Sequence, residues 1–412
     1  MLKDFCRVSN VFEDEFIGLR FINGKPLVTF PRGYRQSEKD EDVRKDIIHL
    51  LTILQRFNDI KDGSGKKTNE GEMLSFPILS YQYVIYNFLA NGYYSEKDIE
   101  YRQSDRGKIS WKRTIQKIKP VIDDGNIVYL DFITKKSITK ADIITKIHEY
   151  CVYESFSKLG WLYLNSNYVP RKPSMKFNKK MFISVLNDAL KNTFNNNKKL
   201  LFSSMLEIIK QADEKADFPD SSYGVTRFEH VWENLIDYVF GVDNKNDYFP
   251  HGHYTIIKNG SITESSALEP DTIMKVGDRL FILDAKYYKY GIISNPAFLP
   301  PTSSIHKQIT YGDYVFTNRF ADADKIYNAF ILPYEAPSKD EVLSFVSVAT
   351  GDWIKYDQDT LNYKYVLVIL LDTRYIMDTY SRQNMKDIDM MAEFIQDSLL
   401  LYKERYIGAK GQ

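Results

Sequence analysis

The sequence predicts an α/β (α+β) protein in which a short mixed β-sheet flanked by helices forms the carboxy-terminal half. Three observations indicate this class. From about residue 217 onward, apolar runs typical of strands alternate with helical patterns. The preceding stretch is dominated by helical periodicity, and the first 75 residues combine strand-like runs with one helix. We therefore expect a small α+β segment over 1–75, a mainly helical domain over 76–217 and the α/β core over 218–412.

In the first region, strand-like runs at Phe16–Phe21 and Pro26–Phe30 precede a helix over Asp40–Phe57. Apolar residues recur in that helix at the spacing of one helical face. The role of this segment stays open between reading DNA, binding a partner and bracing the core.

Helical periodicity marks long segments of the middle region at Ile78–Ala90, Ala141–Leu159 and Lys179–Ala216. Between the first two, residues 108–119 place several basic side chains among large apolar ones, and we take Lys112 and Arg113 as candidate DNA contacts. A solvated helix face explains the same charges equally well. The middle region is therefore a candidate contact with DNA or with a partner.

The carboxy-terminal region is expected to hold these elements in order: a helix over Thr226–Phe240, strands over Tyr254–Lys258, Asp271–Lys275 and Leu280–Tyr287, a helix over Ser303–Thr317, strands over Tyr327–Leu332 and Tyr365–Leu371, and a helix over Met385–Tyr402. Helices on both sides of such a sheet give one α/β core.

The composition limits the classes of function. The 55 basic residues balance the 55 acidic ones, so any contact with nucleic acid must come from local patches. Two cysteines supply neither a disulfide framework nor a cysteine zinc site. No apolar run is long enough to cross a membrane, and no signal segment is evident. We expect a soluble, cytoplasmic protein with no membrane partner.

Three charged residues on two adjoining strands form the candidate catalytic centre. Asp284 and Lys286 are two apart in a strand and therefore point to the same face. A turn at Gly277–Asp278 brings Asp271, on the preceding strand, beside them. Two carboxylates and an ammonium in one place suit a divalent cation and an attacked phosphate, because a metal polarises the phosphoryl oxygen and activates water.

Magnesium is the expected cofactor, since it takes oxygen ligands and keeps several waters. Asp271, Asp284 and the carbonyl of Ala285 are the expected ligands, and Lys286 would orient the attacking water or stabilise charge on the phosphate. Glu233 is the preferred third carboxylate because it adjoins the apolar face of its helix, with Glu229, one turn earlier, as the reserve.

The helix that follows offers three further candidates. Lys307, Gln308 and Tyr311 lie near its start, and Gln308 and Tyr311 share a face. Such side chains can hold DNA phosphates or a metal-bound water.

A surface ion pair between Asp284 and Lys286 on an edge strand is the alternative, because this spacing also arises by chance. The apolar run Phe281–Leu283 directly before Asp284 favours a buried strand and a functional carboxylate at its end.

Together these stretches resemble the PD-(D/E)xK nuclease superfamily, here as Pro270-Asp271 and Asp284-Ala285-Lys286. The carboxy-terminal half is similar more narrowly to LlaJI-type restriction endonucleases and McrC-type nuclease subunits. The stretches that carry this resemblance, in order, are Phe228–Glu233, Glu269–Asp271, Ile282–Tyr288, Lys307–Tyr311 and Val366–Asp372, with a further likeness at Gly107–Ile115.

The resemblance implies a restriction-endonuclease-like core that cleaves double-stranded DNA with Mg²⁺ in the restriction of foreign DNA. It implies that Asp271, Asp284 and Lys286 are catalytic, and less directly Glu233. Open alternatives are an autonomous enzyme paired with a cognate DNA methyltransferase and a subunit that needs a separate AAA+ GTPase. A non-catalytic DNA-binding or assembly protein that keeps the nuclease fold is a third, and a repair or recombination nuclease is a fourth. Cutting both strands also suggests a homodimer or paired complexes.

Overall fold

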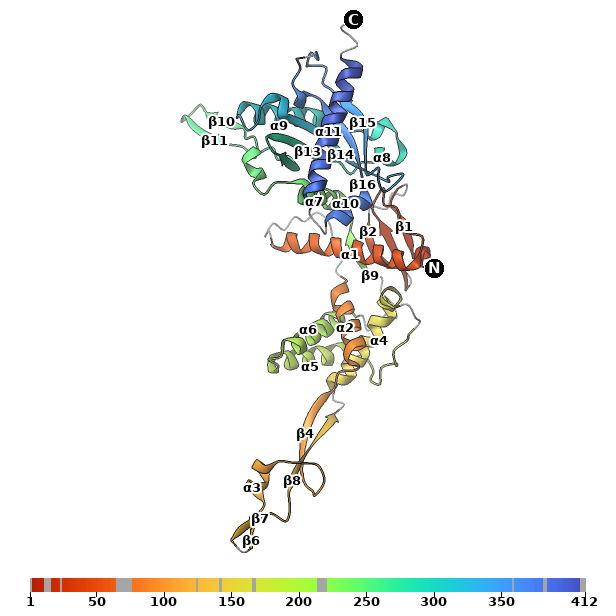
Figure 1. Cartoon of the computed structure of the whole chain (residues 1–412), viewed down its shortest axis with the longest axis vertical. Coiled ribbons are helices and arrows are strands. Elements are labelled where there is room, and N and C mark those ends of the chain that lie inside the picture. The colour runs from red at the N-terminus through yellow and green to blue at the C-terminus, as the bar shows by residue number, and fades with distance from the viewer. Residues whose placement is uncertain are drawn as a thin grey trace. The chain divides into compact units, whose positions relative to one another are not determined.

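A computed structural model describes residues 2–10, 16–22, 24–63, 76–123, 125–140, 143–164, 168–212, 221–357, 359–380 and 384–407. The chain divides into two compact units (Figure 1). The first unit joins Met1–Ser75 to Ser221–Gln412, and the second is Phe76–Asp220.

The first unit is built on a five-stranded mixed sheet. Its strands are β12 (Thr272–Val276), β13 (Arg279–Ala285), β14 (Ile326–Tyr334), β16 (Val366–Asp372) and β15 (Leu343–Ala349), in that spatial order. The three central strands are parallel, and the two edge strands run antiparallel to their neighbours. Every residue of β14 and β16 is buried, which explains their continuous apolar sequences: both faces of the sheet are covered.

Helices α9 (Thr302–Thr317) and α11 (Met385–Tyr406) cover opposite faces of this sheet. On β13, Ile282 belongs to a buried cluster with Tyr311 of α9. The next residue towards the turn, Phe281, stacks on Tyr327, whose hydroxyl accepts a hydrogen bond from Gln396 on α11 at 3.0 Å. Alternate strand residues therefore face different helices. Figure 1 shows α11 lying across the sheet.

Helix α7 (Phe228–Phe240) is fixed to the sheet by its fully buried tryptophan. The indole Nε1 of Trp232 donates to the carbonyl of Ile331 on β14 at 3.2 Å. This contact holds the helix that carries Glu233 near the end of β13.

The amino-terminal segment shares a sheet with the carboxy-terminal region. The strand order is β1 (Cys6–Val8), β3 (Lys25–Phe30), β2 (Ile17–Ile22) and β9 (Ser221–Val225). Strand β2 pairs with β9, which directly precedes α7, so residues that are distant in the chain complete one sheet. Pairing between strands so far apart in the chain leaves no local pattern in the sequence. The sequence therefore indicated residues 1–75 as a separate segment and did not predict the pairing of β2 with β9.

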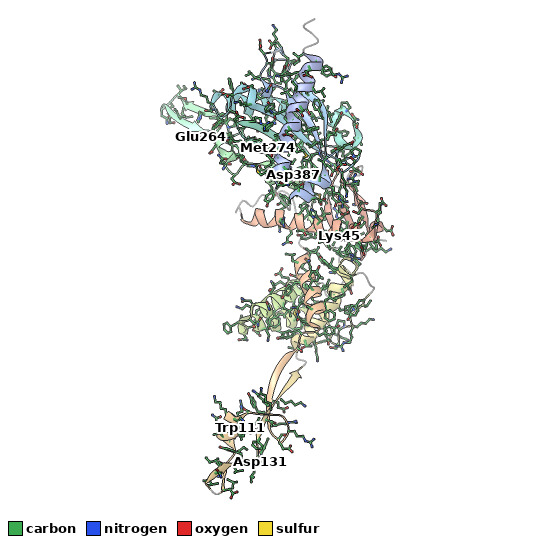
Figure 2. All side chains as sticks on the ribbon, viewed as in Figure 1. Lys45, Trp111, Asp131, Glu264, Met274 and Asp387 are labelled. Atoms are coloured by element: carbon green, nitrogen blue, oxygen red, sulfur yellow. The ribbon has the colours of Figure 1, made fainter. Side chains whose placement is uncertain are left out.

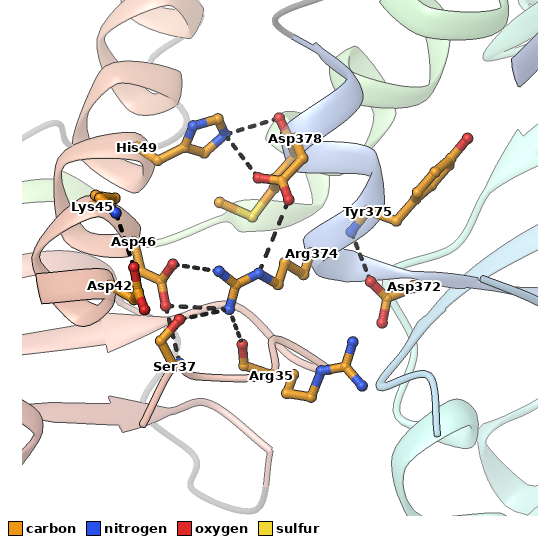
Figure 3. Close-up of polar contacts among 11 residues, drawn as sticks. Arg35, Ser37, Asp42, Lys45, Asp46, His49, Asp372, Arg374, Tyr375 and Asp378 are labelled. Atoms are coloured by element: carbon orange, nitrogen blue, oxygen red, sulfur yellow. Dashed lines mark hydrogen bonds and ion pairs between the residues drawn. The ribbon is translucent and has the colours of Figure 1, made fainter. Parts of the chain in front are cut away.

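An ion-pair network joins helix α1 (Asp40–Gly63) to α10 (Thr373–Tyr380) (Figure 3). Arg374 contacts the buried carboxylate of Asp46 through two nitrogens, at 2.7 and 3.3 Å. The same guanidinium donates to the carbonyl of Arg35 and the hydroxyl of Ser37. A buried carboxylate is stable only with such partners, so this network secures the amino-terminal segment.

The second unit combines a helical bundle with a small sheet. Its helices are α2 (Ile78–Asn91), α4 (Ile143–Tyr163), α5 (Lys179–Asn192) and α6 (Asn196–Gln211). The same unit contains the sheet β4 (Glu96–Gln103), β8 (Ile133–Lys140) and β5 (Lys108–Ile109), helix α3 (Trp111–Lys117), and the hairpin β6 (Val121–Asp123) with β7 (Asn126–Val128).

The single helix expected over Lys179–Ala216 was wrong. It is two helices, because Asn195 caps α6 by accepting the backbone N–H of Lys198 at 3.1 Å. Ala216 itself lies outside the described residues.

The remaining described elements are short, and η denotes a 3-10 helix. They are η1 (Leu2–Phe5), η2 (Lys245–Tyr248), β10 (His253–Ile256), β11 (Ser261–Glu264), α8 (Tyr290–Ile293), η3 (Pro296–Phe298), η4 (Ala323–Lys325) and η5 (Asn362–Lys364). Among the helices in the described ranges, none combines the length and the apolar character that crossing a bilayer requires.

Candidate active site

The β12–β13 hairpin brings Asp271 beside Asp284. The last strand pair at the open end of the hairpin is Thr272 opposite Leu283, and Asp271 and Asp284 are the residues that adjoin this pair. The backbone N–H of Ala285 donates to Oδ2 of Asp271 at 2.9 Å. The predicted juxtaposition therefore follows from the register, and the hydrogen bond holds the Asp271 carboxylate against β13.

Lys286 forms an ion pair with Asp284. Its Nζ lies 2.5 Å from Oδ2 of Asp284, and both side chains are mostly buried. Its backbone N–H donates to the carbonyl of Ile331 at 2.9 Å, which continues the pairing with β14 beyond the end of the strand. Burial lowers the pKa of Lys286, but Asp284 and then Asp271 outweigh it, so the net shift is upward.

Like charges crowd around Asp271. Burial, then the carboxylates of Asp284 and Glu233, raise the pKa of Asp271, while Lys286 and the N–H of Ala285 oppose the shift. Carboxylates forced together in this way favour a bound cation, because a cation relieves both the burial and the repulsion.

Glu233 and Glu229 project from α7 towards different partners. Oε2 of Glu233 lies 3.3 Å from Nδ1 of His230, while Oε1 of Glu229 accepts a hydrogen bond from Nε of Arg227 at 2.7 Å. Of these two glutamates, Glu233 is the one that raises the pKa of Asp271. Because Glu233 acts electrostatically on Asp271, Glu233 remains the preferred third carboxylate.

A lysine that the sequence analysis missed supports the site through the backbone of Asp271. Nζ of Lys245, in η2, contacts Oδ2 of Asp237 on α7 at 2.5 Å and donates to the backbone carbonyl of Asp271 at 3.0 Å. It thereby ties the end of α7 to the residue that carries the candidate catalytic carboxylate. Lys245 lies in an ordinary polar stretch, and no local signal marks it.

The candidates on α9 separate into buried and exposed residues. Gln308 is fully buried, and its Nε2 donates to the carbonyls of Ile282 at 3.1 Å and Ala329 at 3.4 Å. Tyr311 is also buried, with its hydroxyl donating to the carbonyl of Glu269 at 3.2 Å.

These contacts correct the predicted DNA-binding role of Gln308, because its amide fastens α9 to β13 and β14 and does not reach the surface. Tyr311 lies close to the centre: burial first, then Asp284 and Asp271, raise the pKa of its phenol. Lys307 is exposed and therefore accessible to DNA. Its contact with DNA stays a prediction.

The oxygen donors fit a hard divalent cation. Mg²⁺ is held in proteins by one or two carboxylates together with water, and Asp271 and Asp284 supply two at positions that adjoin the last strand pair. Across the described residues, no group of three or more His, Cys, Asp or Glu side chains forms a ready metal cluster. The expected set of Asp271, Asp284, the Ala285 carbonyl and Glu233 therefore stays a prediction.

In the second unit, the predicted basic face is exposed. Lys112 and Arg113 lie on α3 with Trp111, which is 54% exposed and is labelled in Figure 2. The guanidinium of Arg113 lies over the ring of Tyr101, 3.7 Å from its centroid. Basic groups suit the phosphate backbone and aromatic rings suit stacking on bases, and the role of Lys112 and Arg113 as DNA contacts stays a prediction.

Comparison with known proteins places the chain among restriction enzymes. A profile of the LlaJI restriction endonuclease family matches residues 16–370, and the chain belongs to this family. This confirms the resemblance to LlaJI-type restriction endonucleases that the sequence motifs indicated.

One relative is described as type II restriction enzyme BsuMI component YdjA of Bacillus subtilis (strain 168). It is 25% identical over 399 residues, which cover 91% of this chain and 82% of the relative. A solved structure of Thermococcus gammatolerans McrB AAA+ hexamers with bound McrC also matches. The TM-score is 0.35 at 15% identity, over 91% of this chain and 83% of that chain.

Proposed function

We propose that this protein is a Mg²⁺-dependent endodeoxyribonuclease of a restriction system, which hydrolyses phosphodiester bonds of double-stranded DNA. One observation carries the proposal: in a chain of a restriction endonuclease family, Asp271 directly precedes β12 and is bonded to the N–H of Ala285, beside Asp284, which Lys286 contacts. Mg²⁺ dependence is the proposed chemistry of this PD-(D/E)xK-like centre.

Asp271, Asp284 and the carbonyl of Ala285 would hold Mg²⁺, with Glu233 as a further oxygen ligand. When bound, the ion polarises the phosphoryl oxygen and makes water nucleophilic near neutral pH. In the reaction, the water oxygen bonds to phosphorus and gives up a proton to solvent, the bond from phosphorus to one sugar oxygen breaks, and that oxygen takes up a proton from solvent.

Lys286 supplies positive charge where the phosphate becomes more negative. Its ammonium is partly buried beside Asp284, so electrostatic stabilisation there is stronger than in water. Tyr311 and Gln308 support the centre through contacts to the backbone of Glu269 and Ile282.

The test compares Asp284→Ala with a control on the same hairpin. Asp284→Ala is expected to lower the cleavage rate of duplex DNA by roughly 10²-fold or more, because it removes a metal ligand and the partner of Lys286. The control is Asp278→Asn, in the exposed turn, which should keep wild-type cleavage. EDTA should abolish cleavage and added Mg²⁺ should restore it. Undiminished cleavage by Asp284→Ala would disprove the site.

A partner-dependent nuclease is the second candidate. The relative in Bacillus subtilis is described as a component of its enzyme, which suggests activity within an assembly. We infer that, in this alternative, the chain cleaves DNA only together with a separate subunit, such as an AAA+ GTPase. Cleavage of methylated and unmethylated plasmid, with and without the partner and GTP or ATP, separates the two candidates. Full activity of this chain alone, unchanged by nucleotide, would exclude the second.

A further inference from the structure

A pocket of about 370 Å³ opens beside the strand end that carries Lys286. Tyr287 and Tyr288, the two residues that follow Lys286, line it together with Arg32 from the amino-terminal segment. Arg227 and Glu229 line it from the start of α7. Glu229 was the reserve for the third carboxylate, but its Oε1 is bonded to Arg227. The other lining residues are outside the proposed metal-binding set, so the pocket is a separate feature next to the catalytic centre.

Arg32 is held rigidly at this pocket. Its backbone N–H donates to the hydroxyl of Tyr287 at 2.7 Å, and its Nη1 donates to the carbonyl of the same residue at 2.8 Å. The hydroxyl of Thr373 donates to the carbonyl of Arg32 at 2.7 Å, and the guanidinium lies over the Tyr287 ring, 4.8 Å from its centroid. The position of the guanidinium is therefore set before any ligand arrives.

The guanidinium keeps unused hydrogen-bonding capacity. Its buried Nε has no hydrogen-bond partner among the described residues. A buried N–H without a partner costs free energy, so a bound acceptor within hydrogen-bonding reach of this nitrogen would lower that cost.

Further polar residues line the same pocket. The pocket lining includes the hydroxyl residues Ser9 and Thr226. Helix α7 begins at this edge with Phe228, also in the lining, so the backbone N–H groups of its first turn add positive potential. Arg227 is paired with Glu229, whose Oε1 accepts from its Nε at 2.7 Å, so the net positive charge of the lining comes from Arg32.

We infer that this pocket binds a phosphate group of the DNA strand, next to the phosphate that is cut. The inference rests on the proposed nuclease function and deepens it, because it gives the amino-terminal segment a direct contact with the substrate. A planar, anchored guanidinium with neighbouring hydroxyls matches the oxygens of a phosphodiester. Tyr287 links the pocket to Lys286 by one peptide bond, so a strand that fills both sites is aligned for cleavage.

The test uses Arg32→Gln, with Arg405→Gln as a matched control. Arg405 is exposed on α11 and lies outside the pocket lining. Duplex binding is measured over a range of salt concentrations, with Ca²⁺ in place of Mg²⁺. Arg32→Gln should weaken binding about fivefold and reduce the slope of log affinity against log salt by about one, because one phosphate contact is lost. Arg405→Gln should change neither quantity.

A second measurement uses inorganic phosphate as the probe. Phosphate should raise the thermal unfolding temperature of the wild type and of Arg405→Gln, and should do so less for Arg32→Gln. Arg227→Gln, which leaves the bonds between Arg32 and Tyr287 in place, should also reduce the salt slope. This second variant guards against a folding defect in Arg32→Gln.

The outcomes separate this inference from the proposed function. An unchanged salt slope in both arginine variants would overturn the DNA contact, even if Asp284→Ala abolishes cleavage as expected. A lower kcat with an unchanged slope would mean that Arg32 only positions Tyr287, and it too would overturn the contact. Loss of phosphate binding with unchanged DNA binding would assign the pocket to a free phosphate or mononucleotide, which also overturns the contact with DNA.

Discussion

At Asp271, the side chain and the backbone are held by different partners. The carboxylate accepts the N–H of Ala285 from the neighbouring strand, and the carbonyl accepts a hydrogen bond from Lys245. The first contact belongs to the hairpin, while the second reaches in from η2. In the proposed site, the carboxylate of Asp271 must be placed within a fraction of an ångström, and these two contacts act together on its position.

Lys245→Met should therefore lower cleavage although Lys245 is not a catalytic residue. We expect kcat to fall about tenfold, since the loss of a charge-assisted hydrogen bond costs about 1.5–3 kcal/mol and the site relaxes only partly. KM for DNA should stay near the wild-type value. The measurement is steady-state cleavage of a plasmid.

Asp237→Asn provides the matched comparison, because Asp237 is the other partner of Lys245. The double variant should be no worse than the poorer single variant, since both remove one linkage. Additive losses in the double variant would show that the two residues act independently.

At the scale of elements, the approach of the amino-terminal segment to β14 depends on one glycine. Gly33 has a φ of +70°, and a Cβ at this position would lie 2.5 Å from the backbone carbon of Tyr334. Both the conformation and the space exclude a side chain. Gly33 directly follows Arg32, which lines the pocket.

Gly33→Ala is expected to destabilise the protein by about 2–4 kcal/mol, from left-handed backbone strain and overpacking. Gly277 is the matched control, since it has a φ of +61° and an added Cβ would meet no described atom within 4 Å. Gly277→Ala should cost only about 1 kcal/mol. Urea unfolding measures both free energies, and equal losses would contradict the close-approach argument.

The link between α1 and α10 depends on a buried ion pair (Figure 3). Arg374→Met should destabilise the protein by about 2–4 kcal/mol, because the carboxylate of Asp46, only 5% exposed, loses its cation. Lys45→Met is the control on the same helix. Its pair with Asp42 is exposed, so its loss should have little effect. Denaturant midpoints test both variants, and similar midpoints would contradict the assigned role.

At the scale of the whole molecule, the two units have different architectures. The first unit contains every candidate catalytic residue and brings together sequence from both ends of the chain. The second is a continuous stretch of chain and carries Lys112 and Arg113 on α3. Its stability depends on groups of its own, including a buried histidine.

His148 should make the stability of the protein depend on pH. Burial lowers the pKa of His148 from 6.5 to about 4, with the carboxylate of Glu149 opposing the shift. Its Nδ1 accepts the backbone N–H of Tyr94 at 2.8 Å. Between pH 6.5 and 4 the unfolded chain binds more protons at this residue than the folded chain, so stability falls as pH falls through this window.

The loss should approach about 3 kcal/mol at the acid end of the window. Urea unfolding of the full chain at several pH values measures it. His148→Gln cannot titrate, and should lose this part of the pH dependence while being less stable at pH 7. The same pH dependence in both proteins would contradict the assignment.

Much of the first unit was predictable because its signals are local. The apolar runs of β13, β14 and β16 and the turn at Gly277 indicate strands without any tertiary information, and antiparallel register then brings Asp271 next to Asp284. The motif and its order along the chain also indicated the LlaJI family, which the comparison confirms.

Local sequence was therefore sufficient to place the charged residues at the strand ends, because alternation and turn formation act over a few residues. Tertiary structure was needed for the pairing of β2 with β9 and for the burial of Gln308. It also brought Lys245 to Asp271, across 26 positions, and Arg32 to Tyr287, across 255 positions. Packing of the whole unit selects these contacts, and no local pattern records that packing.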